Sequence, residues 1–199
     1  MAYSACTAAV AANIQIDCSK PIVAGYTGRG VLIPYNTTDL ALTINANNPR
    51  ILNAVAIGTS AHICVIDNVM TDPFSGSTKA GNTDSGFPKY TKTVAVKIPM
   101  RGALASKEVV EPLANQPLGS LLILEKKDKS GKGSFEVIGL NDPAHCDVTS
   151  ISQSESENGG AWVMNFVSTE NFAECEFQNS DTTYASTLAD FENLLAKGF

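Results

Sequence analysis

Two short histidine–cysteine pairs are the residues in this chain best suited to bind a metal ion. His62 lies two positions before Cys64, and His145 directly precedes Cys146. Two imidazole nitrogens and two thiolates would complete a tetrahedral zinc site if the pairs met in space. The spacing within each pair is shorter than is usual between zinc ligands. We therefore interpret the pairs as unrelated, with Cys64 in a buried strand, and predict no metal site.

A cysteine nucleophile and a pair of carboxylates are the candidates for catalysis. Cys175 with His145 would form a nucleophile–base pair, although no local motif marks it. Glu155 and Glu157 could act as acid and base, but catalytic carboxylates need a partly dry environment and these two lie among serines. The GxSxG, HExxH and SxxK motifs are missing. The sequence therefore predicts no catalytic residue and a protein that is not an enzyme.

Two glycine-rich segments are candidates for binding phosphate. Residues 25–30 read Gly-Tyr-Thr-Gly-Arg-Gly, and residues 130–133 read Ser-Gly-Lys-Gly. Neither matches the motif of a nucleotide-binding loop, and no helix pattern follows that would aim backbone amides at a phosphate. We interpret the first segment as a structural bend and the second as part of a hairpin tip, and we predict no cofactor.

The charge balance argues against tight binding of nucleic acid. The chain has 20 acidic and 14 basic residues, which give a formal net charge of −6. Its one dense basic run is Lys126, Lys127, Lys129 and Lys132, interrupted by Asp128. We interpret this run as a solvated hairpin tip. Proteins that hold DNA need cationic clusters, whereas a negative surface lets DNA slide past without specific binding.

The cysteine count and the hydropathy pattern bear on the compartment. Five cysteines at irregular spacings, without a CxxC motif, make a poor disulfide framework. Residues 1–12 lack the features of a secretion signal, and no segment has the apolar length of a membrane span. The sequence predicts reduced thiols, synthesis in a cytosol and no membrane partner.

Alternation of apolar and polar residues predicts strands along most of the chain. The clearest strand covers 90–98, where Tyr90, Val94, Val96 and Ile98 share one face. Further strands are predicted over 13–17, 31–34, 40–44, 51–58, 61–69, 148–151 and 161–167. In the last of these Trp162 shares a face with apolar residues, so we interpret it as a core anchor rather than a ligand platform.

Two longer features frame these strands. Apolar runs over 118–125 and 134–140 predict a long β-hairpin over 118–140 with a charged tip. The stretch 72–88 is rich in Gly, Ser, Thr and Asp without an apolar period, and we predict a polar loop or arm that reaches a neighbour.

Helical patterns are few. Residues 186–197 carry one apolar stripe, with Ser186 as the predicted N-cap, and residues 106–113 suit a short helix that stops near Pro112. We predict a single mainly β domain over 1–199, with an N-terminal arm over 1–20. The predicted fold is an antiparallel β-sandwich or barrel with one peripheral C-terminal helix.

The second half of the chain resembles a known class of proteins. Residues 121–140 read Leu-Leu-Ile-Leu-Glu-Lys-Lys-Asp-Lys-Ser-Gly-Lys-Gly-Ser-Phe-Glu-Val-Ile-Gly-Leu, and residues 154–162 read Ser-Glu-Ser-Glu-Asn-Gly-Gly-Ala-Trp. With the strand-then-helix ending, over roughly 89–197, these parts resemble virion structural proteins of tailed phages that infect gut Bacteroidetes, including crAss-like phages. The resemblance implies a tail-tube-like fold repeated around a hollow channel, and no catalytic residue.

The resulting hypothesis is a ring-forming subunit of a bacteriophage tail tube that lines a conduit for the genome. Its expected partners are copies of itself and other virion tail proteins, with assembly in the host cytoplasm and a final place in the virion. The hairpin over 118–140 is expected to contact adjoining subunits or the next ring, and acidic residues to face the lumen. Alternatives are a head–tail connector, a capsid decoration or fibre protein, a carbohydrate-binding β-sandwich with an exposed aromatic platform, and an enzyme using Cys and His or a metal.

Overall fold

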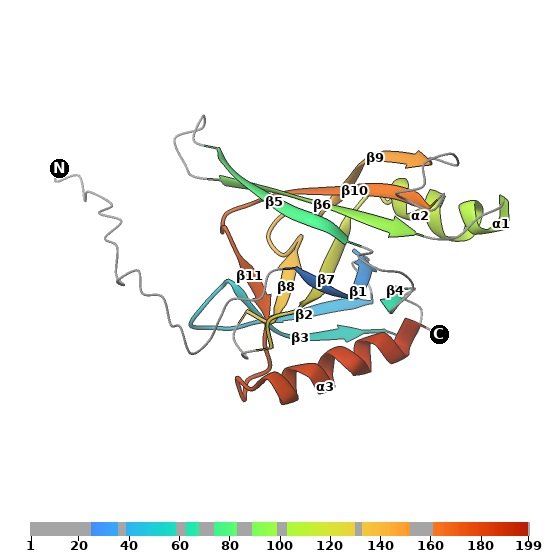
Figure 1. Cartoon of the computed structure of the whole chain (residues 1–199). Coiled ribbons are helices and arrows are strands. Elements are labelled where there is room, and N and C mark those ends of the chain that lie inside the picture. Colours follow the sequence, from blue (N-terminus) through green and yellow to red (C-terminus); the bar gives the residue numbers. More distant parts are fainter. Residues whose placement is uncertain are drawn as a thin grey trace, which may run out of the picture.

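The protein is mainly β and is built as two packed open sheets with a C-terminal helix, as a computed structural model shows (Figure 1). The structure describes residues 25–35, 39–58, 63–67, 74–82, 89–98, 103–129, 133–151 and 161–198. The predicted fold class, an antiparallel β-sandwich or barrel with one peripheral C-terminal helix, is confirmed, and the open sheets are those of a sandwich. The predicted arm over 1–20 lies outside the described residues.

The larger sheet has seven strands in the order β2-β3-β11-β8-β7-β1-β4. Its strands are β1 Tyr26–Pro34, β2 Leu40–Ile44, β3 Ile51–Ile57, β4 Cys64–Asp67, β7 Ser120–Lys126, β8 Phe135–Ile138 and β11 Cys175–Phe177. Neighbouring strands run antiparallel except β11 and β3, which pair in parallel. That parallel pair departs from the purely antiparallel sandwich expected from the sequence.

The smaller sheet has four antiparallel strands in the order β5-β6-β10-β9. Its strands are β5 Phe74–Asn82, β6 Lys89–Ile98, β9 His145–Ile151 and β10 Trp162–Glu170. One face packs on the larger sheet through a shared apolar cluster that includes Val94, Val96, Met164 and Phe166. The period-two pattern over 90–98 predicted β6 and its buried face correctly.

The strands of the predicted hairpin over 118–140 lie in the middle of the larger sheet. Leu122 and Leu124 of β7 face the smaller sheet, while Leu121 and Ile123 face the side covered by the C-terminal helix. A strand buried on both faces reads as a continuous apolar run, which explains the local sequence. Because β1 and β11 flank β7 and β8, the strands of this hairpin have no open edge for a neighbouring subunit. A contact of this hairpin with adjoining subunits therefore cannot use the edges of its strands.

The predicted polar loop over 72–88 contains a strand. Phe74 at its start is buried and its ring packs edge-on against Tyr26, with the ring centroids 5.9 Å apart. The rest of β5 pairs through its backbone with β6, from Phe74 opposite Val96 to Asn82 opposite Lys89. An edge strand of small polar residues leaves no apolar period in the sequence, so the prediction of a structureless loop was wrong for 74–82. Residues 83–88 lie outside the described part.

The C-terminal helix α3 covers Tyr184–Leu195 and continues as a 3-10 turn over Ala196–Gly198. Its N-cap is Thr183, whose hydroxyl oxygen accepts the backbone N–H of Ser186 at 3.2 Å. Ser186 therefore lies within the first turn of α3. The prediction of Ser186 as the N-cap was wrong by about one turn, because the N-cap is Thr183. Phe191, Leu194 and Leu195 bury the predicted apolar stripe against the larger sheet.

A second helical segment runs from α1 Ala103–Ala105 through a π-helical turn Ser106–Val110 into α2 Glu111–Ala114. Pro112 is the second residue of α2 and directly follows the π-helical turn. The helix ends two residues beyond Pro112 rather than at it. No described helix is long and apolar enough to span a membrane.

Candidate functional site

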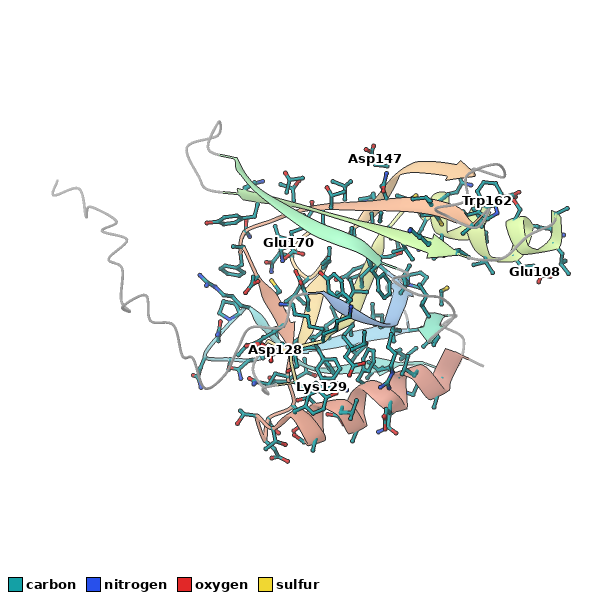
Figure 2. All side chains as sticks on the ribbon, in the orientation of Figure 1. Glu108, Asp128, Lys129, Asp147, Trp162 and Glu170 are labelled. Atoms are coloured by element: carbon teal, nitrogen blue, oxygen red, sulfur yellow. The ribbon has the colours of Figure 1, made fainter. Side chains whose placement is uncertain are left out.

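The described residues best placed for chemistry form a buried cluster between the sheets. Lys92 of β6 and Glu170 at the end of β10 are both fully buried, and the Lys92 Nζ lies 2.7 Å from the Glu170 Oε2 (Figure 2 shows Glu170 between the sheets). The buried thiol of Cys175 on β11 donates to the same Oε2 at 3.1 Å. Strand pairing explains the meeting, because Lys92 lies opposite Ser168, two residues before Glu170 on the same face of β10.

The other carboxylate oxygen of Glu170 has a different set of donors. Its Oε1 accepts the backbone N–H of Gly139 at 2.6 Å and the hydroxyl of Ser168 at 3.2 Å. The carbonyl of Gly139 in turn accepts the hydroxyl of Tyr35 at 2.7 Å. A buried charge is tolerated only when it is paired and hydrogen-bonded, and these contacts meet that requirement.

The surroundings keep the Cys175 thiol protonated. Burial, helped by the charge of Glu170, raises the pKa of the Cys175 thiol to about 12. A thiol with such a pKa donates a hydrogen bond and is a poor nucleophile. His145 is exposed on the edge strand β9, and the thiol is directed to Glu170 instead. The structure therefore does not form the Cys175–His145 nucleophile pair that we considered from the sequence.

The residues considered as zinc ligands are not gathered either. Cys64 lies half-buried on β4 of the larger sheet, while His145 and Cys146 lie on β9 of the smaller one. Burial raises the pKa of the Cys64 thiol, which disfavours the thiolate that a metal needs. His62 lies outside the described residues. Across the described ranges, no group of three or more metal-binding side chains was found.

The described glycines of the glycine-rich candidates have structural roles, and the acidic candidates lie outside the described residues. Gly28 has a φ of +94° within a register shift of β1 between Tyr26 and Gly30, which is the bend predicted from the sequence. In the segment 130–133 only Gly133 is described, and its N–H donates to Glu176. Glu155 and Glu157 lie outside the described residues. Trp162 packs against the core, as predicted.

The described lysines of the basic run are engaged with their own chain. The Lys126 Nζ lies 3.5 Å from a carboxylate oxygen of the buried Glu136. The Lys129 Nζ lies 5.8 Å from the centroid of the Tyr184 ring. These contacts fit a hairpin end packed on α3 better than a phosphate site; Lys132 lies outside the described residues.

A second buried carboxylate fixes α3 on the larger sheet. Glu125 accepts the hydroxyl of Tyr184 at 2.7 Å and the hydroxyl of Thr27 at 2.7 Å, and Arg29 lies 3.5 Å away. Burial, together with the bond to Glu125, raises the pKa of Tyr184 far above its ordinary value. The tyrosine is therefore a permanent donor at ordinary pH.

Replacing Tyr184 with phenylalanine should lower the free energy of unfolding by about 1–3 kcal/mol, because Glu125 loses a donor inside the protein. Urea denaturation measures the change. Tyr90→Phe is the matched control. Tyr90 is half-buried on β6, and within the described part of the chain its hydroxyl does not bond to a buried carboxylate as the Tyr184 hydroxyl does. Equal effects of the two substitutions would refute the assigned role of the Tyr184 hydroxyl.

A groove of about 210 Å³ lies between α3 and β3. It is lined by Ala54, Val55, Phe177, Asp190, Asn193, Leu194 and Lys197. None of the described residues considered for catalysis or metal binding lines this groove. The buried cluster around Glu170 therefore brings together more chemically active groups than any other described site. One feature of the sequence pointed to it: Lys92 and Glu170 both fall at inward-facing positions of strands in which buried and less buried residues alternate.

Comparison with models of known protein families, with curated proteins and with solved structures gave no match to this chain.

Proposed function

We propose that this protein is a ring-forming structural subunit of a bacteriophage tail tube, in which copies join through the edges of the smaller sheet. The observation that carries the proposal is that β5 pairs only with β6, and β9 only with β10, among the described strands. The sheet therefore has two edges with backbone groups available to another chain. The resemblance of residues 89–197 to virion proteins supplies the biological setting.

The two open edges favour a closed ring. Contact of β5 in one copy with β9 in the next uses two different surfaces, so each added copy presents the same edge again. Such a heterologous contact closes when the rotation between copies divides a full turn. The strands have similar lengths, nine residues in β5 and seven in β9, and neither contains proline. Backbone pairing of this kind is an established mode of association.

The outer face of the smaller sheet suits a conduit that does not hold DNA. Its half-buried residues are mostly small and uncharged, on β6 Thr91, Thr93, Ala95 and Lys97, and on β10 Val163, Asn165, Val167 and Thr169. Lys97 is the charged residue among these eight. A face without a cationic cluster binds the phosphates of DNA only weakly.

The location of the acidic residues changes the expected character of that conduit. Glu125, Glu136 and Glu170 are buried inside the protein, so they do not face a lumen. The formal charge of −6 therefore overstates the negative charge of the surface. We accordingly propose a nearly neutral lumen face in place of the acidic face expected from the sequence.

Electron microscopy of the purified protein tests the proposal, because rings would be seen directly. We expect wild-type rings and a loss of rings in Thr78→Pro, which places a proline in β5. The loss should amount to at least about tenfold weaker association, since a proline disrupts the edge strand that each contact between copies uses. Thr43→Pro on β2, an edge strand of the larger sheet, is the matched control and should leave rings intact.

Two results would contradict the proposal. One is a wild-type protein that stays monomeric at high concentration and is absent from virions. The other is normal ring formation by a folded Thr78→Pro variant, since that would place the subunit contact elsewhere. Circular dichroism of each variant shows whether it is folded.

The alternative virion roles place the protein at a different position in the particle. Mass spectrometry of separated heads and tails distinguishes a tail subunit from a connector or a decoration protein. The carbohydrate-binding alternative gains nothing from the structure, because every described aromatic side chain is buried or half-buried. Stacking on sugars needs an exposed ring.

A further inference from the structure

We propose that the side chains of Lys92 and Glu170 condense into an intramolecular isopeptide bond. The amine and the carboxylate already touch, with the Nζ 2.7 Å from the Oε2, and the acyl carbon is one covalent bond further. Both side chains are fully buried, in a sheet interface lined by apolar residues. The inference concerns this chain alone and does not depend on ring formation.

The reaction needs a neutral amine next to a carboxylic acid. An ammonium group cannot attack a carboxylate, whereas an amine can attack a carboxylic acid. A proton that moves along the existing Nζ–Oε2 hydrogen bond of 2.7 Å produces that pair of groups. The fold also holds the two groups together continuously, which replaces an encounter between separate molecules.

The two oxygens of Glu170 are held by different kinds of donor. Gly139 N–H and the Ser168 hydroxyl both point at Oε1, at 2.6 Å and 3.2 Å. Negative charge gathers on this oxygen when the amine adds to the acyl carbon, and two donors there stabilise it. The same donors remain satisfied afterwards, because Oε1 becomes the amide carbonyl oxygen.

The oxygen that must depart is the one near the proton sources. Oε2 contacts the Lys92 ammonium at 2.7 Å and the Cys175 thiol at 3.1 Å. The thiol stays protonated in this setting, so it can hydrogen-bond to the departing oxygen without competing as a nucleophile. Cys175 is a positioning residue in this scheme.

The step balances without any added reagent. The Lys92 ammonium and the Glu170 carboxylate become a neutral amide and one water molecule. The new bond joins Nζ to the acyl carbon, and the bond that breaks joins that carbon to Oε2. Of the three ammonium protons, two leave with Oε2 as water and one remains on the amide nitrogen. No group is oxidised or reduced.

The bond would join β6 to β10 across a sequence separation of 78 residues. Those strands are neighbours in the smaller sheet, so the bond would prevent them from separating. In a ring subunit this is the sheet that carries the contacts between copies, and a covalent tie there resists mechanical load.

Mass spectrometry of the denatured, reduced wild-type protein tests the inference. We expect a mass lower than that of the sequence by one water molecule, and a digest containing a branched peptide that links Lys92 to Glu170. Lys97→Met, on the outer face of β6, should keep the loss of water. Lys92→Met should abolish it, and Glu170→Gln should lose one ammonia molecule in place of water.

The full sequence mass in the folded wild-type protein would overturn the inference and leave a buried ion pair. A loss of water located elsewhere in the chain would overturn it as well. Hydroxylamine distinguishes a loss of water at Lys92 and Glu170 from one at a cyclic imide of an aspartate, because it opens the imide but leaves an isopeptide bond intact. The wild-type peptide decides the question even if the Lys92 variant does not fold.

Discussion

Replacing Lys92 with methionine should lower the free energy of unfolding by about 3–5 kcal/mol. The substitution keeps a long apolar stem but removes the cation that lies 2.7 Å from Glu170. Glu170 would then remain fully buried beside Cys175, Ser168 and Gly139 without a countercharge. Hydrogen bonds alone offset only part of the cost of burying a charge. Where the isopeptide bond has formed, the variant also loses that tie, and the loss is larger.

Lys97→Met is the control for this prediction, because Lys97 lies on the same strand but on its outer face. A change within about 0.5 kcal/mol is expected there. In the double variant Lys92→Met with Glu170→Met, both charges are absent, and much of the stability should return. Urea denaturation of the wild type, the single variants Lys92→Met and Glu170→Met, and the double variant completes the cycle. A Lys92 variant as stable as the control would show that the pair carries no net stabilisation.

The fold class was predictable because most strands carry their pattern locally. The alternation over 90–98 predicted β6, and the apolar stripe of 186–197 predicted α3 apart from its N-cap. The parallel pairing of β11 with β3 was not predictable, since it joins Glu176 to Ile51 without any local signal. The same holds for β5, whose partner strand, rather than its own residues, makes it a strand.

The buried cluster could be predicted only in part. Alternation places Lys92 on the face of Val94 and Val96, and Glu170 on the face of Phe166, but a charged residue is normally assigned to solvent. Assigning a charged residue to solvent is wrong when the register of the neighbouring strand places an opposite charge beside it. The register of β6 against β10 is not written in either strand alone. The sequence therefore contained the positions of both residues but not their contact.

Replacing Gly139 with alanine should lower the free energy of unfolding by about 3 kcal/mol, from backbone strain and steric overlap together. Gly139 has a φ of +92°, which favours glycine. A Cβ there would lie 2.5 Å from the Ser120 carbonyl oxygen and 3.0 Å from the Ala144 amide nitrogen. Both atoms are backbone, and they belong to the bridge that joins Ser120 to Ala144 through hydrogen bonds of 2.8 Å and 2.9 Å. The overlap therefore cannot be relieved by the movement of a flexible side chain.

Gly133→Ala separates overlap from backbone strain in this prediction. Gly133 also has a positive φ, +74°, but among the described residues its Cβ would meet only the Glu176 carboxylate oxygen, at 3.8 Å. Only the cost of the left-handed backbone applies there, and a loss of about 1 kcal/mol is expected. The difference between the variants, measured by urea denaturation, reports how rigidly the Ser120–Ala144 bridge holds the amide that binds Glu170. If both variants lose the same stability, the bridge yields to a methyl group, and the Gly139 N–H is not a fixed donor to Glu170.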